Sequence, residues 1–269
     1  MFTFVSANYV AFAFRHRRLD AADPLTFAHL LIHLVAMLTR WKLLGLLLLH
    51  ASIAAPLQRT AAQTPHCPPF DTTASWAQVN RAWSNELSLH WSDDSLRSVL
   101  LALRDQDQAV RADVGAHVSD TLYGRQMKNT DSVISTHMAA ILDRFGLPTR
   151  SMVGAAGADA AMLIVQHSWP LQERVLALAK GMPLGEISLQ SMALLEDRVL
   201  VHQGRAQRFG TQFTLGSDGL ARFEAVSDTT SLDARRATAG MPPLAQYVCL
   251  MEAAGMHIDH GSLPPTSRP

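Results

Sequence analysis

An apolar region near the N-terminus, interrupted by cations, is the feature that most limits how this chain can fold. From Met37 a short basic segment precedes the apolar run Leu43–Leu49, and small residues follow. This order is typical of a secretory signal peptide. We therefore predict a signal peptide over residues 37–62, with cleavage after Ala62 or, alternatively, after Ala54. The mature chain is then expected in the periplasm or outside the cell.

The alternative to cleavage is a retained membrane anchor. A spanning helix needs about 20 apolar residues. Arg40 and Lys42 divide the region into two shorter apolar runs, Leu25–Thr39 and Leu43–Leu57. We therefore expect only transient contact with the membrane, through the signal peptide, and keep an inner-membrane anchor as the alternative.

Residues 1–36 fit neither reading, because a signal peptide does not normally begin so far into a chain. Our hypothesis is that translation starts at Met37 and that residues 1–36 are a mis-annotated extension. The mature domain then covers residues 63–269.

Composition favours a globular domain over a disordered chain or a nucleic-acid binder. Hydrophobic residues make up 48% of the chain, charged residues 17%, and the formal net charge is zero. Without a basic stripe, nucleic-acid binding is not expected. Cys67 and Cys249 could pair in an oxidising compartment, or remain two unconnected thiols.

Apolar residues at spacings of three and four, after residues that cap helices, predict a series of amphipathic helices. Three predicted helices begin after the cap residues Asp71-Thr72-Thr73, Ser92-Asp93-Asp94 and Thr130-Asp131. The other predicted helices cover Ala158–His167, the segment that begins at Trp169, Ile187–His202, Asp233–Ala239 and Pro243–Gly255.

Three features refine this pattern. The face of the second helix should carry Leu96, Val99, Leu100 and Leu103, and Gly146 and Pro148 should end the third helix. Ala158–His167 is nearly apolar throughout and should be the central buried helix, preceded by a loop over Thr149–Gly157. The expected fold is one compact, mainly α domain with a short irregular or hairpin segment near 204–224.

Several motifs in the middle of the chain carry a family resemblance. They are Pro148–Gly154, Ala160–His167, Leu195–Val199 and Gly204–Gln212. In this order they resemble a bacterial family known only as a domain of unknown function, DUF6624. The resemblance runs from about Leu96 to Leu244 and implies no particular reaction. Two departures stand out: the family often has acidic residues where Ser168-Trp169-Pro170 stands, and commonly Tyr in place of Phe209.

The same motifs hold the candidate site residues. His167 ends an apolar helix and is a candidate base, with Asp197 orienting it and Arg198 binding an anionic group. The further candidate binding residues are Gln166, Gln207, Gly210, Thr211 and Gln212. A purely structural polar network is the alternative. Asp105 and Asp107 could join such a network, but we expect them on a solvated helix face.

The chain contains no nucleophile elbow, phosphate-binding loop or His-Glu-x-x-His motif, so we predict neither a metal nor a cofactor. The sequence thus favours an exported helical module that binds a small molecule or an envelope protein. The alternative is a periplasmic hydrolase in which His167 and Asp197 carry acid–base catalysis.

Overall fold

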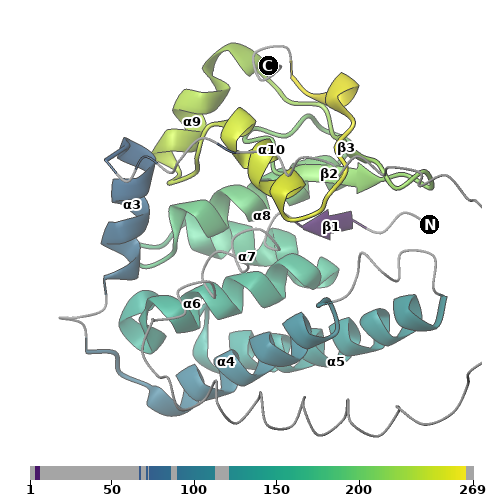
Figure 1. Cartoon of the computed structure of the whole chain (residues 1–269). Coiled ribbons are helices and arrows are strands. Elements are labelled where there is room, and N and C mark those ends of the chain that lie inside the picture. Colours follow the sequence, from purple (N-terminus) through teal and green to yellow (C-terminus); the bar gives the residue numbers. More distant parts are fainter. Residues whose placement is uncertain are drawn as a thin grey trace, which may run out of the picture. The chain divides into compact units, whose positions relative to one another are not determined.

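The computed structural model describes residues 4–6, 67, 71, 73–85, 90–112 and 121–264. They belong to one compact unit formed by residues 1–11 and 65–269 (Figure 1). The second unit, residues 12–64, lies outside the described residues, and so do the predicted signal peptide and both predicted cleavage sites.

Helices dominate the described part of the chain, which confirms the mainly α prediction. The α-helices are α3 (Ser75–Ser84), α4 (Asp94–Ala109), α5 (Thr121–Phe145), α6 (Arg150–His167), α7 (Gln172–Lys180), α8 (Leu189–His202), α9 (Leu232–Thr238) and α10 (Leu244–Ala253). Short 3-10 turns are η2 (Trp169–Leu171), η3 (Thr229–Ser231) and η4 (His260–Ser262). No helix in this part of the chain is both long and apolar enough to cross a bilayer.

Helix α6 is the centre of a first hydrophobic core and lies beside α4 and α5 (Figure 1). Its side chains are buried on nearly every face, Ala161 and Ile164 among them, as predicted. The predicted loop before it is wrong over most of its length, since helical structure already begins at Arg150. Gly154, at φ 69° and ψ 170°, interrupts the regular helix and separates two helical segments at a kink, because glycine carries no Cβ to oppose that conformation.

Helix α4 begins where the cap signal predicted. The Asp93 carboxylate accepts a 2.8 Å hydrogen bond from the Leu96 amide. Leu96, Leu100 and Leu103 are buried, whereas Val99 is exposed, so the predicted apolar face is narrower than expected.

Helix α5 begins at Thr121, well before the predicted start at Thr130-Asp131. Asp131 caps nothing, because its carboxylate pairs with the side chain of Arg111. The predicted end is confirmed: Gly146 has φ 76° and its amide donates to the Leu142 carbonyl.

A small antiparallel sheet lies in the C-terminal half, where the hairpin was predicted. Strands β2 (Gln212–Leu215) and β3 (Ala221–Phe223) pair with each other, and β1 (Phe4–Ser6) pairs with β2, in the order β1-β2-β3. Phe213 and Phe223 join α10 in a second hydrophobic core. A chain that starts at Met37, or one cleaved after Ala62, would lack β1.

Helix α8 connects the two cores. Leu195 and Val199 belong to the first core and Leu194 to the second. Successive residues of an α-helix point about 100° apart, since 3.6 residues make one turn. Neighbouring polar residues on α8 can therefore serve different parts of the protein.

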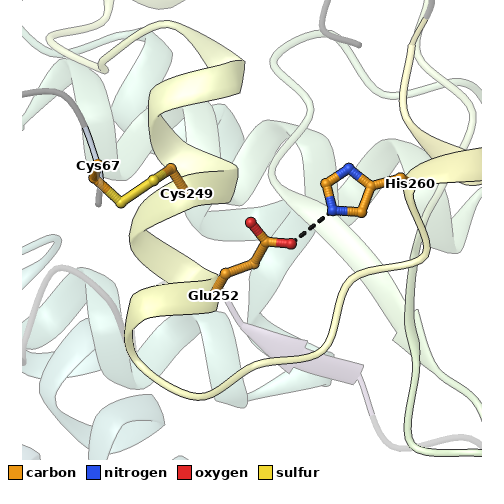
Figure 2. Close-up of a disulfide and its surroundings, with 4 residues drawn as sticks. All are labelled: Cys67, Cys249, Glu252 and His260. Carbon is orange, nitrogen blue, oxygen red and sulfur yellow. Dashed lines mark hydrogen bonds and ion pairs between the residues drawn. A yellow bond between two sulfur atoms is a disulfide. The ribbon is translucent and has the colours of Figure 1, made fainter. Parts of the chain in front are cut away.

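A disulfide joins Cys67 to Cys249 on α10, so the paired alternative is the one present (Figure 2). The two Cα atoms are 5.6 Å apart, a usual separation for a bridge. Nearby, Nε2 of His260 and Oε1 of Glu252 form an ion pair at 2.6 Å on the surface (Figure 2). The bridge spans 182 residues of sequence and ties the entry of the domain to its last α-helix.

Replacing Cys67 with Ser should lower the free energy of unfolding by about 2–5 kcal/mol, because the bridge restricts a long segment of the unfolded chain. Cys249→Ser should cost the same, and the double variant should cost no more than either single one. Urea denaturation without reductant measures the loss. Glu252→Gln, beside the bridge, is the control and should cost less than about 1 kcal/mol. Equal stabilities for wild type and Cys67→Ser would contradict a structural role for the bridge.

Candidate functional site

Five charged or ionisable side chains meet where α4, α5, α6 and α8 come together. We call them the Asp107 cluster, and they are Asp107, Arg111, Asp131, His167 and Arg198. Asp107 lies on α4 and Arg111 just beyond it, Asp131 lies on α5, His167 ends α6 and Arg198 lies on α8.

Asp107 is the carboxylate that contacts His167. Nδ1 of His167 lies 2.9 Å from both carboxylate oxygens, and only 1% of Asp107 is exposed. Two expectations from the sequence are therefore wrong: Asp107 does not lie on a solvated face, and Asp197 does not orient His167. Asp107 follows Leu100 and Leu103 on the buried face of α4, which turns it toward α6.

Arg111, four residues after Asp107, forms an ion pair with the same carboxylate. Its Nη1 donates to Asp107 Oδ1 at 2.8 Å, and its Nη2 donates to Asp131. Burial alone would raise the pKa of Asp107, but His167 and Arg111 offset that effect, and the pKa lies below its ordinary value. Asp107 is therefore a carboxylate anion at neutral pH.

His167 is neutral at the same pH. Burial and the charge of Arg111 lower its pKa below the ordinary value, although Asp107 acts in the opposite direction. Because an ionised carboxylate only accepts hydrogen bonds, Nδ1 must carry the proton and donate it to Asp107. Nε2 then holds a lone pair, and no described residue forms a hydrogen bond with it.

Arg198 is the least satisfied member of the cluster. Only 5% of the residue is exposed, and its Nε and Nη2 are buried with no hydrogen-bond partner in the part of the chain that the structure describes. Burial, then the charge of Arg111, lowers its pKa to about 10, against the opposing effects of Asp107 and Asp131. Arg198 thus remains a cation at pH 7, with two donors unused.

The charge of Arg198 acts on His202, whose ring contacts Gln172 and Trp169. Nδ1 of His202 lies 3.2 Å from Oε1 of Gln172, and burial together with the charge of Arg198 lowers the pKa of His202 to about 4. The ring of Trp169, which is exposed, meets the His202 ring edge-on at 3.8 Å. Gln172 also donates to the main-chain oxygen of Gln166, whose residue is buried.

The cluster reaches the protein surface at one end. The side chains of Arg111 and Asp131 are 15% and 28% exposed, and that of His167 is 9% exposed. Asp107 and Arg198 are more deeply buried, at 1% and 5% exposed.

Asp197 serves a different part of the protein. Its carboxylate accepts hydrogen bonds from the amides of Arg208, Phe209 and Thr211, at 2.6 to 3.1 Å, and from the Thr211 hydroxyl at 2.9 Å. Because Asp197 and Arg198 are consecutive on α8, they point in different directions. Asp197 therefore holds the loop of residues 208–211, which we call the 208–211 loop.

Gln207 and Gln212 complete the support of this loop. Oε1 of Gln207 accepts from the amides of Thr211 and Gln212 at 2.7 and 2.8 Å, and its Nε2 donates to the carbonyls of Gln212 and Glu224. Nε2 of Gln212 donates to the Thr211 hydroxyl at 3.0 Å. Gly210, at φ 64°, allows the turn. Gln207, Thr211 and Gln212 thus bond to one another and to neighbouring protein groups, and Gly210 supplies the turn.

Arg236, which the sequence did not single out, fixes the same loop from α9. It is buried, and it donates to the carbonyls of Phe209 at 2.6 Å and Pro242 at 2.7 Å. Its guanidinium also lies over the ring of Tyr247. The loop is held through its amides by Asp197 and Gln207, and through its carbonyls by Arg236.

The sequence also missed Asp107, Arg111 and Asp131. One signal was present: Leu100, Leu103 and Asp107 are spaced to share one helix face, and Arg111 follows Asp107 by four residues. Within the described residues, no group of three His, Cys, Asp or Glu side chains is arranged to hold a metal ion.

Replacing Asp197 with Asn should lower the free energy of unfolding by about 2–4 kcal/mol. The amide group of Asn removes an acceptor and turns a donor toward backbone amides that are themselves donors. Chemical denaturation measures the loss. Glu196→Gln is the matched control, since Glu196 forms only exposed ion pairs with Lys180 and Arg208, and it should cost less than about 1 kcal/mol. Equal costs for the two variants would show that Asp197 does not hold the loop.

Comparison with known proteins gives one result on family and none on activity. No curated protein and no solved structure matches the chain. Residues 94–259 match the model of a family described as a family of unknown function, DUF6624. The matched segment contains the whole Asp107 cluster and the 208–211 loop, and it covers more than half of the chain. The chain therefore belongs to the DUF6624 family, as the order of its motifs had suggested.

Proposed function

We propose that this domain binds a small molecule at the Asp107 cluster, with Arg198 and Nε2 of His167 as the contacting groups. The observation that carries the proposal is the pair of buried Arg198 donors that lack an acceptor in the described chain. Buried donors are rarely left unpaired, because each loses its hydrogen bonds to water on folding. A bound molecule that supplies acceptors would remove this cost.

A contrast within α8 supports a binding role over a purely structural one. Every donor that faces Asp197 reaches an acceptor, as expected of a network that only stabilises the fold. Arg198, the next residue, has a fixed charge and unused donors. A network built for stability alone would not leave such a cation incomplete.

The contact between His167 and Asp107 favours a second candidate, a periplasmic hydrolase. A carboxylate that accepts from Nδ1 fixes the tautomer and leaves Nε2 able to take a proton. Positioned in this way, His167 could activate a water molecule as a general base. In this alternative Asp107 takes the orienting role that the sequence had assigned to Asp197, and Arg198 stabilises negative charge.

Replacing Arg198 with Met should leave the Tm of the ligand-free domain unchanged or raise it. The variant removes an unpaired buried cation and puts an apolar side chain of similar length in its place. In a thermal-shift screen of small metabolites, compounds that stabilise the wild type should no longer stabilise Arg198→Met. Arg174→Met is the matched control, because Arg174 forms an exposed ion pair with Asp143, and it should respond to compounds like the wild type.

Two outcomes of this screen would contradict the binding proposal: no compound of any class stabilises the wild type, or Arg198→Met unfolds far more easily than Arg174→Met without any ligand. The same screen separates the hydrolase from the binding module. If a bound compound is also consumed, and His167→Gln stops its consumption while binding persists, the domain is an enzyme. If binding compounds are recovered intact, it is a binding module.

We also propose that the domain works outside the cytoplasm, in the periplasm or after secretion. Support comes from the order of basic, apolar and small residues over 37–62 and from the disulfide between Cys67 and Cys249. Disulfides persist mainly in oxidising compartments.

Export predicts that a periplasmic or extracellular fraction contains a processed chain that begins at Gln63, with the bridge oxidised. Intact mass with and without thiol alkylation measures both features at once. A full-length chain found soluble and reduced inside the cell would overturn the proposal. A full-length chain in the membrane fraction would favour the anchored alternative.

A further inference from the structure

We infer that the ligand of the Asp107 cluster carries a carboxylate group, which Arg198 binds side-on through Nε and Nη2. The inference rests on the proposed binding function and adds to it the chemical class of the ligand. It is argued from the geometry of the open donors, from the charges around them and from the surroundings of Arg198.

The open donors of Arg198 match a carboxylate in shape. Nε and Nη2 lie on the same edge of the planar guanidinium group and present two N–H bonds side by side. The two oxygens of a carboxylate accept such a pair at once, whereas an amide or a ketone offers a single oxygen. Both donors lack an acceptor in the described chain and are covered by other protein atoms, so a carboxylate that binds them must displace part of that cover.

Two other arginines of the domain find acceptors within the protein. Arg111 donates from Nη1 to Asp107 and from Nη2 to Asp131, which are carboxylates of the protein itself. Arg236 donates from Nε to Pro242 and from Nη1 to Phe209. Arg198 is thus the cation of this cluster whose acceptor must come from elsewhere.

The charges around Arg198 disfavour a ligand that carries more than one negative charge. Arg111 and Arg198 are balanced by the carboxylates of Asp107 and Asp131, while His167 is neutral at pH 7. A carboxylate ligand brings one negative charge into this balanced cluster, whereas a phosphate dianion would bring two. Since both aspartates repel an incoming anion at short range, a carboxylate is favoured over a phosphate.

The charge of Arg198 acts on the ring of His202, and this ring packs edge-on against that of Trp169 at 3.8 Å. These rings can contact the remainder of a ligand whose carboxylate lies on Arg198. An acid with an apolar or aromatic body would therefore fit better than acetate.

Matched acids and amides test the inference directly. Acetate and benzoate, with acetamide and benzamide as their neutral counterparts, are titrated into the ¹⁵N-labelled domain while the arginine Nε–H signals are recorded by NMR. The Arg198 signal is identified by its absence in Arg198→Lys. We expect both acids to shift this signal, benzoate to bind more tightly than acetate, and each amide to bind at least about ten-fold more weakly than its acid.

The lysine variant tests whether the paired donors matter beyond their charge. Arg198→Lys keeps the positive charge but loses the planar edge, so it should bind benzoate about ten- to a hundred-fold more weakly. Arg174→Lys, at an exposed ion pair, is the control and should bind like the wild type. Circular dichroism establishes that both variants fold, and the comparison of acid with amide needs only the wild type.

Three results would overturn the inference: amides bind as tightly as acids, inorganic phosphate binds more tightly than benzoate, or no acid shifts the Arg198 signal. Failure of the inference can be told from failure of the proposed function. If neutral or cationic metabolites stabilise the wild type but not Arg198→Met, the binding site stands and its ligand is not a carboxylate. If no compound of any class binds, both fail.

Discussion

The buried contact between Asp107 and His167 is the interaction on which the helical half of the domain depends. An ionised carboxylate with 1% exposure is tolerated only when it is fully paired, and its partners come from elements far apart in sequence. His167 fixes the end of α6 against α4, and Arg111 extends the contact to Asp131 on α5. The same contact sets the position of Nε2 of His167, so the packing of three helices and the chemistry of the candidate site are one arrangement.

Helix α8 carries two consecutive buried residues of charged type whose surroundings differ. Asp197 points toward the 208–211 loop, where five donor–acceptor contacts satisfy its carboxylate. Arg198 is rotated about 100° from it and points toward the Asp107 cluster, where its Nε and Nη2 lack acceptors. Asp197 and Arg198 are both buried residues of charged type, so residue type alone does not distinguish them. They differ in how many hydrogen bonds their side chains make within the described chain.

Most of the fold could be predicted because its signals are local. The Asp93 cap, the buried spacing of Leu96, Leu100 and Leu103, and the stop at Gly146 each depend on a few neighbouring residues. The errors arose where a local signal has two meanings. Thr130-Asp131 resembles a helix cap, but Asp131 forms an ion pair with Arg111 in mid-helix. The glycines of 149–157 suggested a loop, but only Gly154 is non-helical, at the kink between two helical segments.

The candidate site was only half predictable, because His167 and Arg198 lie in recognisable motifs while their partners are chosen by helix packing. The spacing of Leu100, Leu103 and Asp107 does show that Asp107 faces the core, but not which residue it meets there. Arg198 permits one more step. Methionine would fill a similar volume without leaving buried donors unpaired, each of which costs about 1–3 kcal/mol. If the binding proposal holds, an arginine at this position opposes the stability of the empty domain, and an acceptor supplied by the ligand offsets that cost.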